Sequence, residues 1–287
     1  MTRWLVTGAE GQMGTDLMQA LQGEKVIGWG HKDLDLTDGY AVRRALHAAA
    51  PDVVLNAAGY TDVDGAETDP EAAGAVNMRG PGVLAAACGE YGTILVHPST
   101  DYVFAGDATR PYKVSDTVGP QSTYARTKEA GEVGVRSAMR KHYIVRTSWL
   151  YGAGGDNFVK TMARLERERD TVKVVDDQLG SPTWAAELVE RLLELATSGV
   201  PWGTYHCTGG GATTWYGLAR AVFEELGADP DRVKPCSTAE MPRPAHRPAY
   251  SVLSNESWET VGLTPMSPWR EALAMAFAKS GDALRAG

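Results

Sequence analysis

Residues 4–14 read WLVTGAEGQMG: a short apolar run, three glycines at intervals of three, and the start of a helical segment. A helix that begins directly after such a turn offers free amide groups and the positive end of its dipole. Gly8, Gly11 and Gly14 would let the backbone approach a pyrophosphate closely. The spacing G-x-x-G-x-x-G departs from the G-x-G-x-x-G of the standard fingerprint, so the strand–turn–helix context carries the prediction. The stretch predicts a dinucleotide-binding unit; a plain tight turn is the alternative.

Strands and helices alternate along the first half of the chain, as they do in folds with parallel sheets. Residues 53–55 and 94–96 are continuous apolar runs, which are typical of strands covered on both faces. The predicted strands are Trp4–Thr7, Val26–Trp29, Val53–Asn56, Ile94–Ser99 and Tyr143–Ser148. The predicted helices between them are Gly14–Leu21, Ala41–Ala49, Pro70–Glu90 and Thr123–Arg140. This order predicts an α/β fold with a Rossmann-type, doubly wound parallel sheet.

The pattern loosens after Tyr151, and we expect a smaller, partly interleaved C-terminal domain there. Residues 1–150 are the expected dinucleotide-binding domain and residues 151–287 the expected substrate domain. Residues 184–208 are expected to return to the first domain, because a helix and the strand Thr204–Cys207 are predicted there. The other predicted elements are helices Asn157–Arg169, Thr213–Leu226 and Pro268–Ala278, strand Val172–Val175, and a proline-rich loop Pro242–Pro248.

Composition excludes several classes of protein. Of the 287 residues, 43% are hydrophobic and 22% charged, which excludes a disordered or fibrous chain. A formal net charge of −8 gives no basic field for nucleic acid, so no such partner is expected. The first apolar run is too short for a signal peptide, and the longest uncharged stretch is too rich in Gly, Thr and Pro for a membrane span. Widely spaced Cys88, Cys207 and Cys236 are typical of reduced thiols in a cytoplasmic protein.

The segment Tyr124-Ala125-Arg126-Thr127-Lys128 is the most informative about chemistry. Residues four apart share one face of a helix, so Tyr124 and Lys128 can reach the same ligand. A phenol with a pKa of about 10 is a poor proton source at neutral pH, and a nearby ammonium lowers that pKa. Tyr124 could then protonate the alkoxide formed when hydride reaches a carbonyl. The spacing alone is common by chance, and an exposed helix face is the alternative.

A second segment strengthens this interpretation. Residues 99–104, Ser-Thr-Asp-Tyr-Val-Phe, follow a predicted strand at the sheet edge where ligands bind in such folds. A hydroxyl there can hydrogen-bond the oxygen that Tyr124 protonates. We assign Thr100 to this role ahead of Ser99, with a capping or turn hydroxyl as the alternative.

The end of the second strand bears on the cofactor. In folds of this kind an acidic residue at this place usually hydrogen-bonds the ribose of NAD. Here the strand is followed by Gly30, His31 and Lys32, and the first carboxylate is that of Asp33. His31 or Lys32 could face a 2′-phosphate. The sequence therefore favours NADPH and leaves NADH open; a solvated loop is the alternative for both side chains.

Four segments together resemble the extended short-chain dehydrogenases/reductases: Gly8–Gly14, Asn56–Gly59, Ser99–Phe104 and Tyr124–Lys128. The more specific resemblance is to the dTDP-4-dehydrorhamnose reductase family, and it runs from residue 4 to about residue 253. The segments that support it are Asn56–Tyr60 followed by Thr61–Asp64, Arg146–Trp149, Asn157-Phe158, Asp177–Thr183 and Arg247–Ser251.

This resemblance implies reduction of the 4-keto group of a dTDP-4-keto-6-deoxyhexose, from dTDP-4-dehydrorhamnose to dTDP-rhamnose. Tyr124 would be the general acid, Lys128 would hold the nicotinamide ribose and tune Tyr124, and Thr100 would orient the keto oxygen. The residues implied around the sugar are Thr61, Val63, Asp101 and Trp149. Those implied around the cofactor, besides Tyr124 and Lys128, are Gly8, Gly11, Gln12, Met13, Gly14, Asp35, Leu36, Ala57, Ala58 and Tyr60.

The proline-rich loop offers a place for the substrate's diphosphate. Arg243 and Arg247 could present planar forks to phosphate oxygens, and Arg247 fits the family pattern better. Asn157 at a helix start could contact the same nucleotide. A surface linker is the alternative for the loop, and Trp215 and Tyr216 are expected in the core of the small domain.

The family resemblance also raises the question of a metal. Some members are dimers that place acidic residues around Mg²⁺. This chain has Asp16 in the first helix and Glu187 later, but no third acid occurs at the expected place, where Lys279 lies nearby. We expect no Mg²⁺ site, and a monomer or a metal-free homodimer.

Three alternatives remain open. Dehydratases of this fold carry Glu after the Thr-Asp pair, whereas Tyr102 follows Asp101 here; epimerases retain NAD tightly. A related 4-ketoreductase of an antibiotic-sugar pathway, such as a dihydrostreptose synthase, would use the same chemistry. A non-catalytic relative, such as the regulatory subunit of methionine adenosyltransferase, is disfavoured because Thr100, Tyr124 and Lys128 occur together.

Overall fold

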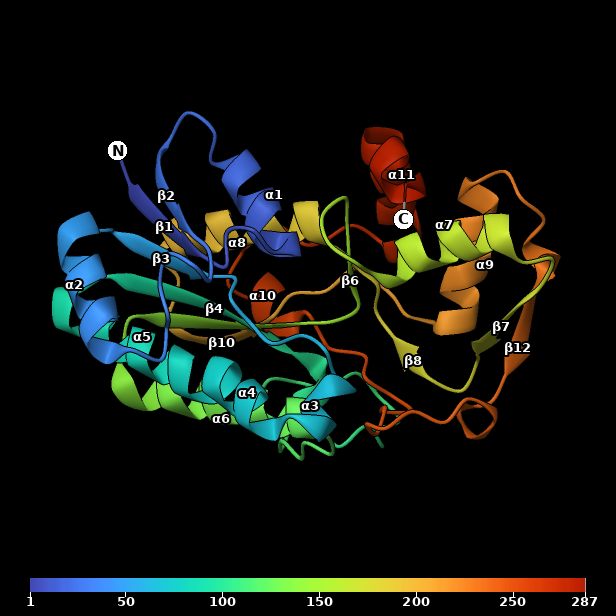
Figure 1. Ribbon diagram of the computed structural model, residues 1–287, viewed down its shortest axis with the longest axis horizontal. Coiled ribbons are helices and arrows are strands. Elements are labelled where there is room, and N and C mark those ends of the chain that lie inside the picture. Colours follow the sequence, from blue (N-terminus) through green and yellow to red (C-terminus); the bar gives the residue numbers. More distant parts are fainter. Residues whose placement is uncertain (287) are drawn as a thin grey trace.

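A computed structural model of the protein, which describes residues 1–286, contains a six-stranded parallel sheet, on the left in Figure 1. The strand order is β2-β1-β3-β4-β5-β10. The strands are β1 (Arg3–Thr7), β2 (Lys25–Trp29), β3 (Val53–Asn56), β4 (Ile94–Thr100), β5 (His142–Thr147) and β10 (Gly203–His206). The chain passes from β1 to β2 on one side and then to β3 on the other, so the order reverses between β1 and β3. The predicted fold class is confirmed.

Helices cover both faces of the sheet. One face packs against α2 (Gly39–Ala49), α5 (Gly80–Tyr91) and α6 (Thr123–Ala138), and the other against α1 (Gln12–Ala20), α8 (Ala185–Ser198) and α10 (Glu256–Glu259). Successive residues of β1 point to opposite faces: Leu5 joins the first core, and Trp4 and Val6 join the second. Burial on both faces is why these strands lack polar alternation.

A third apolar core belongs to the C-terminal part of the chain, to the right of the sheet in Figure 1. It is built from α7 (Phe158–Glu168), α9 (Trp215–Glu225) and α11 (Trp269–Arg285, kinked at Ser280). Paired short strands lie beside these helices: β6 (Leu150–Tyr151) with β9 (Thr183–Trp184), β7 (Val172–Val175) with β12 (Val233–Cys236), and β8 (Leu179–Gly180) with β11 (Thr213–Thr214). Between these segments, α8 packs against α1 and β10 pairs with β5, so the chain returns to the large sheet.

The predicted helix Pro70–Glu90 is confirmed as one continuous helical stretch, with a π-helical turn inside it. After the short α3 (Gly65–Thr68), the turn Ala75–Arg79 joins α4 (Pro70–Gly74) directly to α5. The side chain of Asn77 in that turn accepts from the backbone N–H of Tyr60 and donates to the carbonyl of Tyr60, both at 2.9 Å. The extra residue of the π-turn thus ties the helix to the loop after β3.

No helix in residues 1–286 is long and apolar enough to cross a membrane. Cys88, Cys207 and Cys236 are buried free thiols.

Candidate active site

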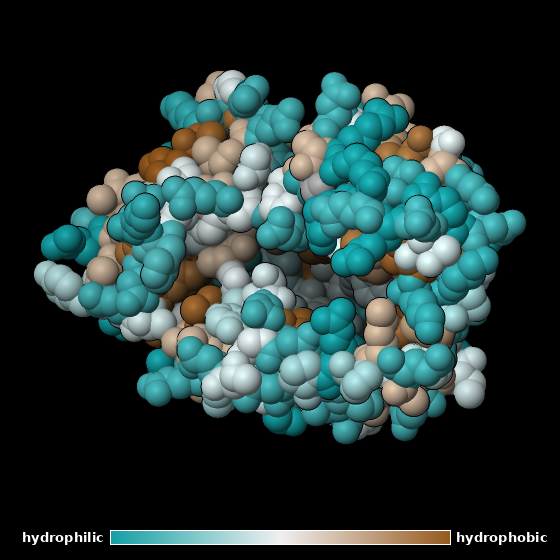
Figure 2. Space-filling view, turned by 45° about the vertical axis from the view of Figure 1, so that its right-hand side comes forward, coloured by the Kyte–Doolittle hydropathy of each residue, from teal (hydrophilic) through white to brown (hydrophobic). Residues whose placement is uncertain are grey.

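A cavity of about 430 Å³ opens at the carboxyl ends of β1, β2 and β3, where the strand order reverses. Ligands bind at this switch point in open α/β sheets. The residues that line the cavity are Thr7, Gly8, Glu10, Gly11, Trp29, Gly30, His31, Leu34, Asp35, Leu36, Thr37, Ala57, Ala58, Gly59, Tyr60 and Val76. Figure 2 shows the molecule from a side on which its surface is deeply hollowed near the centre, with mainly hydrophilic residues on the rim.

The glycine turn leaves no space for side chains. Gly8 has φ +68°, and a Cβ there would lie 2.5 Å from the backbone nitrogen of Ala58. A Cβ on Gly14 would lie 2.0 Å from the carbonyl oxygen of Gly8. The turn can therefore form only with glycine at these two places, and it leaves the start of α1 without a side-chain cap. A turn with free backbone amides and no side chains can accommodate the diphosphate of a dinucleotide.

Seven of the predicted cofactor residues line the cavity: Gly8, Gly11, Asp35, Leu36, Ala57, Ala58 and Tyr60. Gln12, Met13, Gly14, Tyr124 and Lys128 do not. Met13 packs in the core beneath α1, so only its backbone could serve a ligand. Gln12 instead lies beside the loop of Gly154 and Gly155.

Sequence reasoning missed several cavity residues, Glu10 and Trp29 among them. The carboxylate of Glu10 lies over Gly30, where an added Cβ would be 2.7 Å from its Cδ. The Asp33 carboxylate accepts from the Gly30 backbone N–H at 2.7 Å, and that of Asp35 accepts from the backbone and hydroxyl of Thr37. Glu10 stands inside the glycine motif, and only the folded turn shows where its side chain points.

Thr100, Tyr124 and Lys128 come together where β4 ends against α6. Ser122 caps α6 by accepting from the Ala125 backbone N–H, which places Tyr124 in the first turn. The phenol of Tyr124 hydrogen-bonds the hydroxyl of Thr100. The Lys128 ammonium, one turn along the same face, donates to the carbonyl oxygen of Pro98 at 2.8 Å. A phenol, a hydroxyl and an ammonium therefore occupy the carboxyl end of one strand.

Burial governs the protonation states of Tyr124 and Lys128. Burial is the largest cause that raises the pKa of Tyr124 to about 12, against the lowering effect of Thr100. Burial also lowers the pKa of Lys128 to about 8, opposed by the Glu132 carboxylate. Burial therefore dominates the pKa of Tyr124, and the expected lowering of this pKa by Lys128 stays a prediction. Tyr124 holds its proton at neutral pH, as a proton donor must.

Asp101 is a further buried group at this strand end. It is 3% exposed, and burial raises the pKa of its carboxyl to about 7 while hydrogen bonds from Ser251 and Thr100 oppose the shift. Thr100 Oγ donates to Asp101 Oδ1 at 3.0 Å, and the other carboxyl oxygen has no partner within the described residues. Asp101 thus orients the Thr100 hydroxyl, leaving its lone pair for the phenol of Tyr124.

Arg247 lies beside the start of α3. Its guanidinium pairs with the Asp64 carboxylate at 3.1 Å, and Asp64 also accepts from the Ala245 backbone N–H at 3.1 Å. Arg243 is farther from Asp64, at 3.8 Å, and its side chain is 62% exposed. Of the predicted sugar residues on this side, Val63 is half-buried and Thr61 is exposed.

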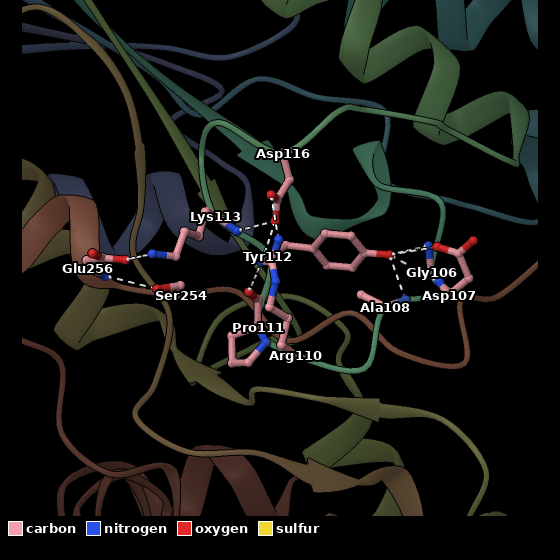
Figure 3. Close-up of polar contacts among 10 residues, drawn as sticks. All are labelled: Gly106, Asp107, Ala108, Arg110, Pro111, Tyr112, Lys113, Asp116, Ser254 and Glu256. Atoms are coloured by element: carbon pink, nitrogen blue, oxygen red, sulfur yellow. Dashed lines mark hydrogen bonds and ion pairs between the residues drawn. The ribbon is translucent and has the colours of Figure 1, made fainter.

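The segment that follows Arg247 is held by the loop before α6. The Tyr112 hydroxyl accepts from the backbone N–H groups of Gly106, Asp107 and Ala108, as Figure 3 shows. Tyr112 also donates its backbone N–H to Val252. Gly106 packs against Pro248, and a Cβ on Gly106 would lie 2.4 Å from this proline, so the C-terminal end of the proline-rich loop Pro242–Pro248 is fixed.

Trp149 lies on the small-domain side with a left-handed backbone, φ +49°. Its ring stacks on Trp215 with centroids 3.5 Å apart and planes 4° apart, and a Cβ on Gly180 would lie 2.4 Å from it. Trp215 packs on the small-domain core, as predicted. Asn157 caps α7 by accepting from the Lys160 backbone N–H and also donates to Gly152, so its amide is already used within the chain.

Asp16 and Glu187 are both buried. Burial raises the pKa of the Asp16 carboxyl, and the charge of Lys279 opposes the shift. Glu187 accepts from the backbone and hydroxyl of Ser267. Residues 1–286 contain no group of three or more His, Cys, Asp or Glu side chains that could hold a metal ion.

Comparison with known proteins gives consistent results. The RmlD substrate binding domain family matches residues 2–281. A dTDP-4-dehydrorhamnose reductase of Streptomyces griseus is 49% identical, with 96% of this chain and 93% of that protein covered. A probable dTDP-4,6-dihydroxy-2-methyloxan-3-one 4-ketoreductase of Streptomyces antibioticus is 45% identical, with 96% and 94% covered. The crystal structure of a Bacillus anthracis dTDP-4-dehydrorhamnose reductase in complex with NADP superimposes with a TM-score of 0.94, at 36% identity, covering 97% of this chain and 99% of that one.

Proposed function

Because this chain belongs to the dTDP-4-dehydrorhamnose reductase family, we propose that it reduces the 4-keto group of dTDP-4-dehydrorhamnose with a nicotinamide cofactor. The chain is an oxidoreductase. The observation that carries the assignment of its site is the meeting of Thr100, Tyr124 and Lys128 at the end of β4. Fold alone would not decide the chemistry. A proton donor with a hydroxyl beside it, at the carboxyl edge of the same sheet as the cavity, supports the reduction of a carbonyl group.

Each residue of the site has a chemical task. The cofactor, bound along the glycine turn and the cavity behind it, supplies the hydride. Tyr124 donates its proton to the oxygen that becomes the 4-hydroxyl. The Thr100 hydroxyl, which donates to Asp101 in this structure, turns to donate a hydrogen bond to that oxygen. Lys128 binds the cofactor ribose and keeps a positive charge near Tyr124, which offsets the negative charge left on the phenol. Thr61, Val63, Asp101 and Trp149 surround the sugar.

We propose NADPH as the preferred cofactor. His31 lines the cavity and Lys32 follows it, whereas the Asp33 carboxylate accepts from the backbone N–H of Gly30. Glu10 opposes this preference, since its carboxylate lies beside Gly30 and would repel a 2′-phosphate. The ratio of the dissociation constants of NADPH and NADH, measured by protein fluorescence, decides the point: a ratio that favours NADH would contradict the proposal.

The experiment that tests the activity is a substrate screen. Purified protein, NADPH and each of several dTDP-4-keto-6-deoxyhexoses are combined, cofactor oxidation is followed by absorbance, and the product is identified by NMR. Fast turnover of dTDP-4-dehydrorhamnose with formation of dTDP-rhamnose is expected. The second candidate is a related 4-ketoreductase, favoured by the relative from Streptomyces antibioticus; preferential turnover of another 4-ketosugar would support it instead.

Turnover should decline as the pH rises through about 8. The proposal requires Lys128 to be charged, and burial lowers its pKa to about 8, so the active form is present below this pH and lost above it. Tyr124 does not limit this range, because its pKa is about 12. The check is kcat as a function of pH at saturating substrate. A plateau that continues far above the Lys128 pKa would contradict the role of this charge.

Replacing Arg247 with Ala should raise the KM for the sugar nucleotide by about 10–100-fold, since a charged hydrogen bond is worth about 1.5–3 kcal/mol. The kcat should stay close to the wild-type value, because Arg247 lies away from the reacting oxygen. Arg243→Ala is the matched control: its side chain is 62% exposed, so its KM should change much less. Steady-state kinetics measures both; an unchanged KM for Arg247→Ala would place the phosphate contact elsewhere.

Four further predictions belong to this proposal. Residues 1–150, with 184–208, form the cofactor domain, and the remainder forms the substrate domain. The protein acts in the cytoplasm, as a monomer or homodimer, and needs no Mg²⁺. Activity that survives exhaustive chelation with EDTA is the expected result for the last of these.

A further inference from the structure

Glu132 is a carboxylate with 0% exposure in α6, and the function proposed above gives it no task. It lies four residues after Lys128 and eight after Tyr124, so the three side chains share one face of the helix. Arg146 of β5 grips both of its oxygens, with Nε 2.9 Å from Oε1 and a terminal nitrogen 2.7 Å from Oε2. Arg136 adds a contact of 2.9 Å to Oε2.

A buried ion pair is weak evidence for stability, because removing two charges from water costs about as much as their attraction returns. Stabilisation of the contact between β5 and α6 therefore does not explain well why the Glu132–Arg146 pair is present. The position of Glu132 explains the pair better, since Glu132 lies one helical turn after Lys128 on the same face of α6. Burial around Lys128 disfavours its charge, and a fixed anion nearby compensates.

We propose that Glu132, held ionised and immobile by Arg146, is a positioning residue that keeps the Lys128 ammonium charged beneath the reacting groups. The catalytic role of Lys128 rests on the proposed function. The effect of Glu132 on the charge of Lys128 does not depend on it. Arg146 acts on Lys128 only through Glu132.

The charged and titratable groups around Lys128 support this assignment. On α6 these are Tyr124, which holds its proton, and Glu132. On β4 they are His97 and, at the strand end, Asp101; burial lowers the pKa of His97 to about 3, so it stays neutral. On β5 the group is Arg146, whose guanidinium faces Glu132. Glu132, whose pKa its arginine partners hold at about 2, is thus the anion that opposes the effect of burial on Lys128.

The test titrates Lys128 directly in the cofactor-free protein. Competitive acetylation with trace acetic anhydride at a series of pH values, read by peptide mass spectrometry, gives the pH at which the Lys128 amine becomes reactive. In Glu132→Gln this midpoint should fall by about one pH unit or more, as expected for loss of a buried opposite charge. Glu129→Gln is the matched control: it removes a carboxylate next to Lys128 whose side chain is 24% exposed, and it should leave the midpoint in place.

A second pair of variants keeps the test decisive even if Glu132→Gln prevents folding. Glu132→Gln leaves the buried Arg146 unpaired, whereas Glu132→Gln combined with Arg146→Met removes both charges. The acetylation midpoint of Lys128 in the double variant should also lie below the wild-type value. Glu132→Asp keeps the charge, so its midpoint should lie closer to the wild-type value. A wild-type midpoint in a folded variant that lacks the carboxylate would overturn the inference.

The activity readout separates this inference from the proposed function. In Glu132→Gln the decline of kcat with pH should begin at lower pH, by the same shift as the acetylation midpoint. If the wild-type protein reduces no 4-ketosugar, the proposed function fails, yet the acetylation result still decides whether Glu132 maintains the charge of Lys128.

Discussion

Tyr124→Phe should lower kcat by about 10²–10⁴-fold, the usual contribution of a positioned proton donor. The phenol is the group at the end of β4 that holds a proton at neutral pH within hydrogen-bonding reach of Thr100. Phenylalanine keeps the ring and its edge-to-face contact with Tyr102, whose centroid is 6.2 Å away, so the fold should be unchanged. The rate of cofactor oxidation under saturating conditions measures the effect.

Two controls make this result specific. The dissociation constant of NADPH should change little, because the ring still fills its place and Lys128, the proposed ribose contact, is unchanged. Tyr40→Phe removes a hydroxyl from a side chain that is 73% exposed and should leave kcat unchanged. If Tyr124→Phe retained most of the wild-type kcat, another group would have to donate the proton.

Gly8→Ala should weaken NADPH binding by more than about tenfold and should destabilise the protein by about 1–3 kcal/mol. The added methyl would meet the backbone of Ala58 at 2.5 Å, in a residue whose φ of +68° already disfavours a side chain. To relieve this contact β1 and β3 would have to separate at the cavity floor, which moves the amides that face the diphosphate. Fluorescence titration with NADPH and thermal unfolding measure the two effects.

Gly23→Ala is the matched control. Gly23 also has a left-handed backbone, with φ +89°, but nothing lies within 4 Å of the position its Cβ would take. It should cost about 1 kcal/mol through backbone strain and leave NADPH affinity unchanged. If the two variants bound NADPH equally, close packing of the glycine turn would not be what the cofactor site needs.

The large sheet could be predicted because each strand carries its own signal. Its strands are continuous apolar runs with glycine or helix starts after them, and the structure keeps each of the five predicted N-terminal strands to within one residue at either end. The π-helical turn at Ala75–Arg79 could not be predicted, since it depends on the amide of Asn77 finding the backbone of Tyr60. A contact between distant segments leaves no periodicity in the sequence.

The candidate site, too, could be predicted only in part from the sequence. Thr100, Tyr124 and Lys128 were found from their spacing and from the strand before them, and the structure brings them together. Their protonation could not be read from the sequence, because the pKa of Tyr124 depends on how deeply the ring is buried. The pairing of Arg247 with Asp64 could not be predicted either, because it joins residues 183 positions apart in the chain.

The late arrival of β10 has a consequence for synthesis of the chain. This strand completes the sheet beside β5, yet it emerges only after α7, β7 and α8 have been made. Until residue 206 leaves the ribosome, β5 is an open edge whose unpaired amides can recruit another nascent chain. Fragments that stop near residue 150 should therefore aggregate, and a chain made without interruption should reach protease resistance only when this last strand docks.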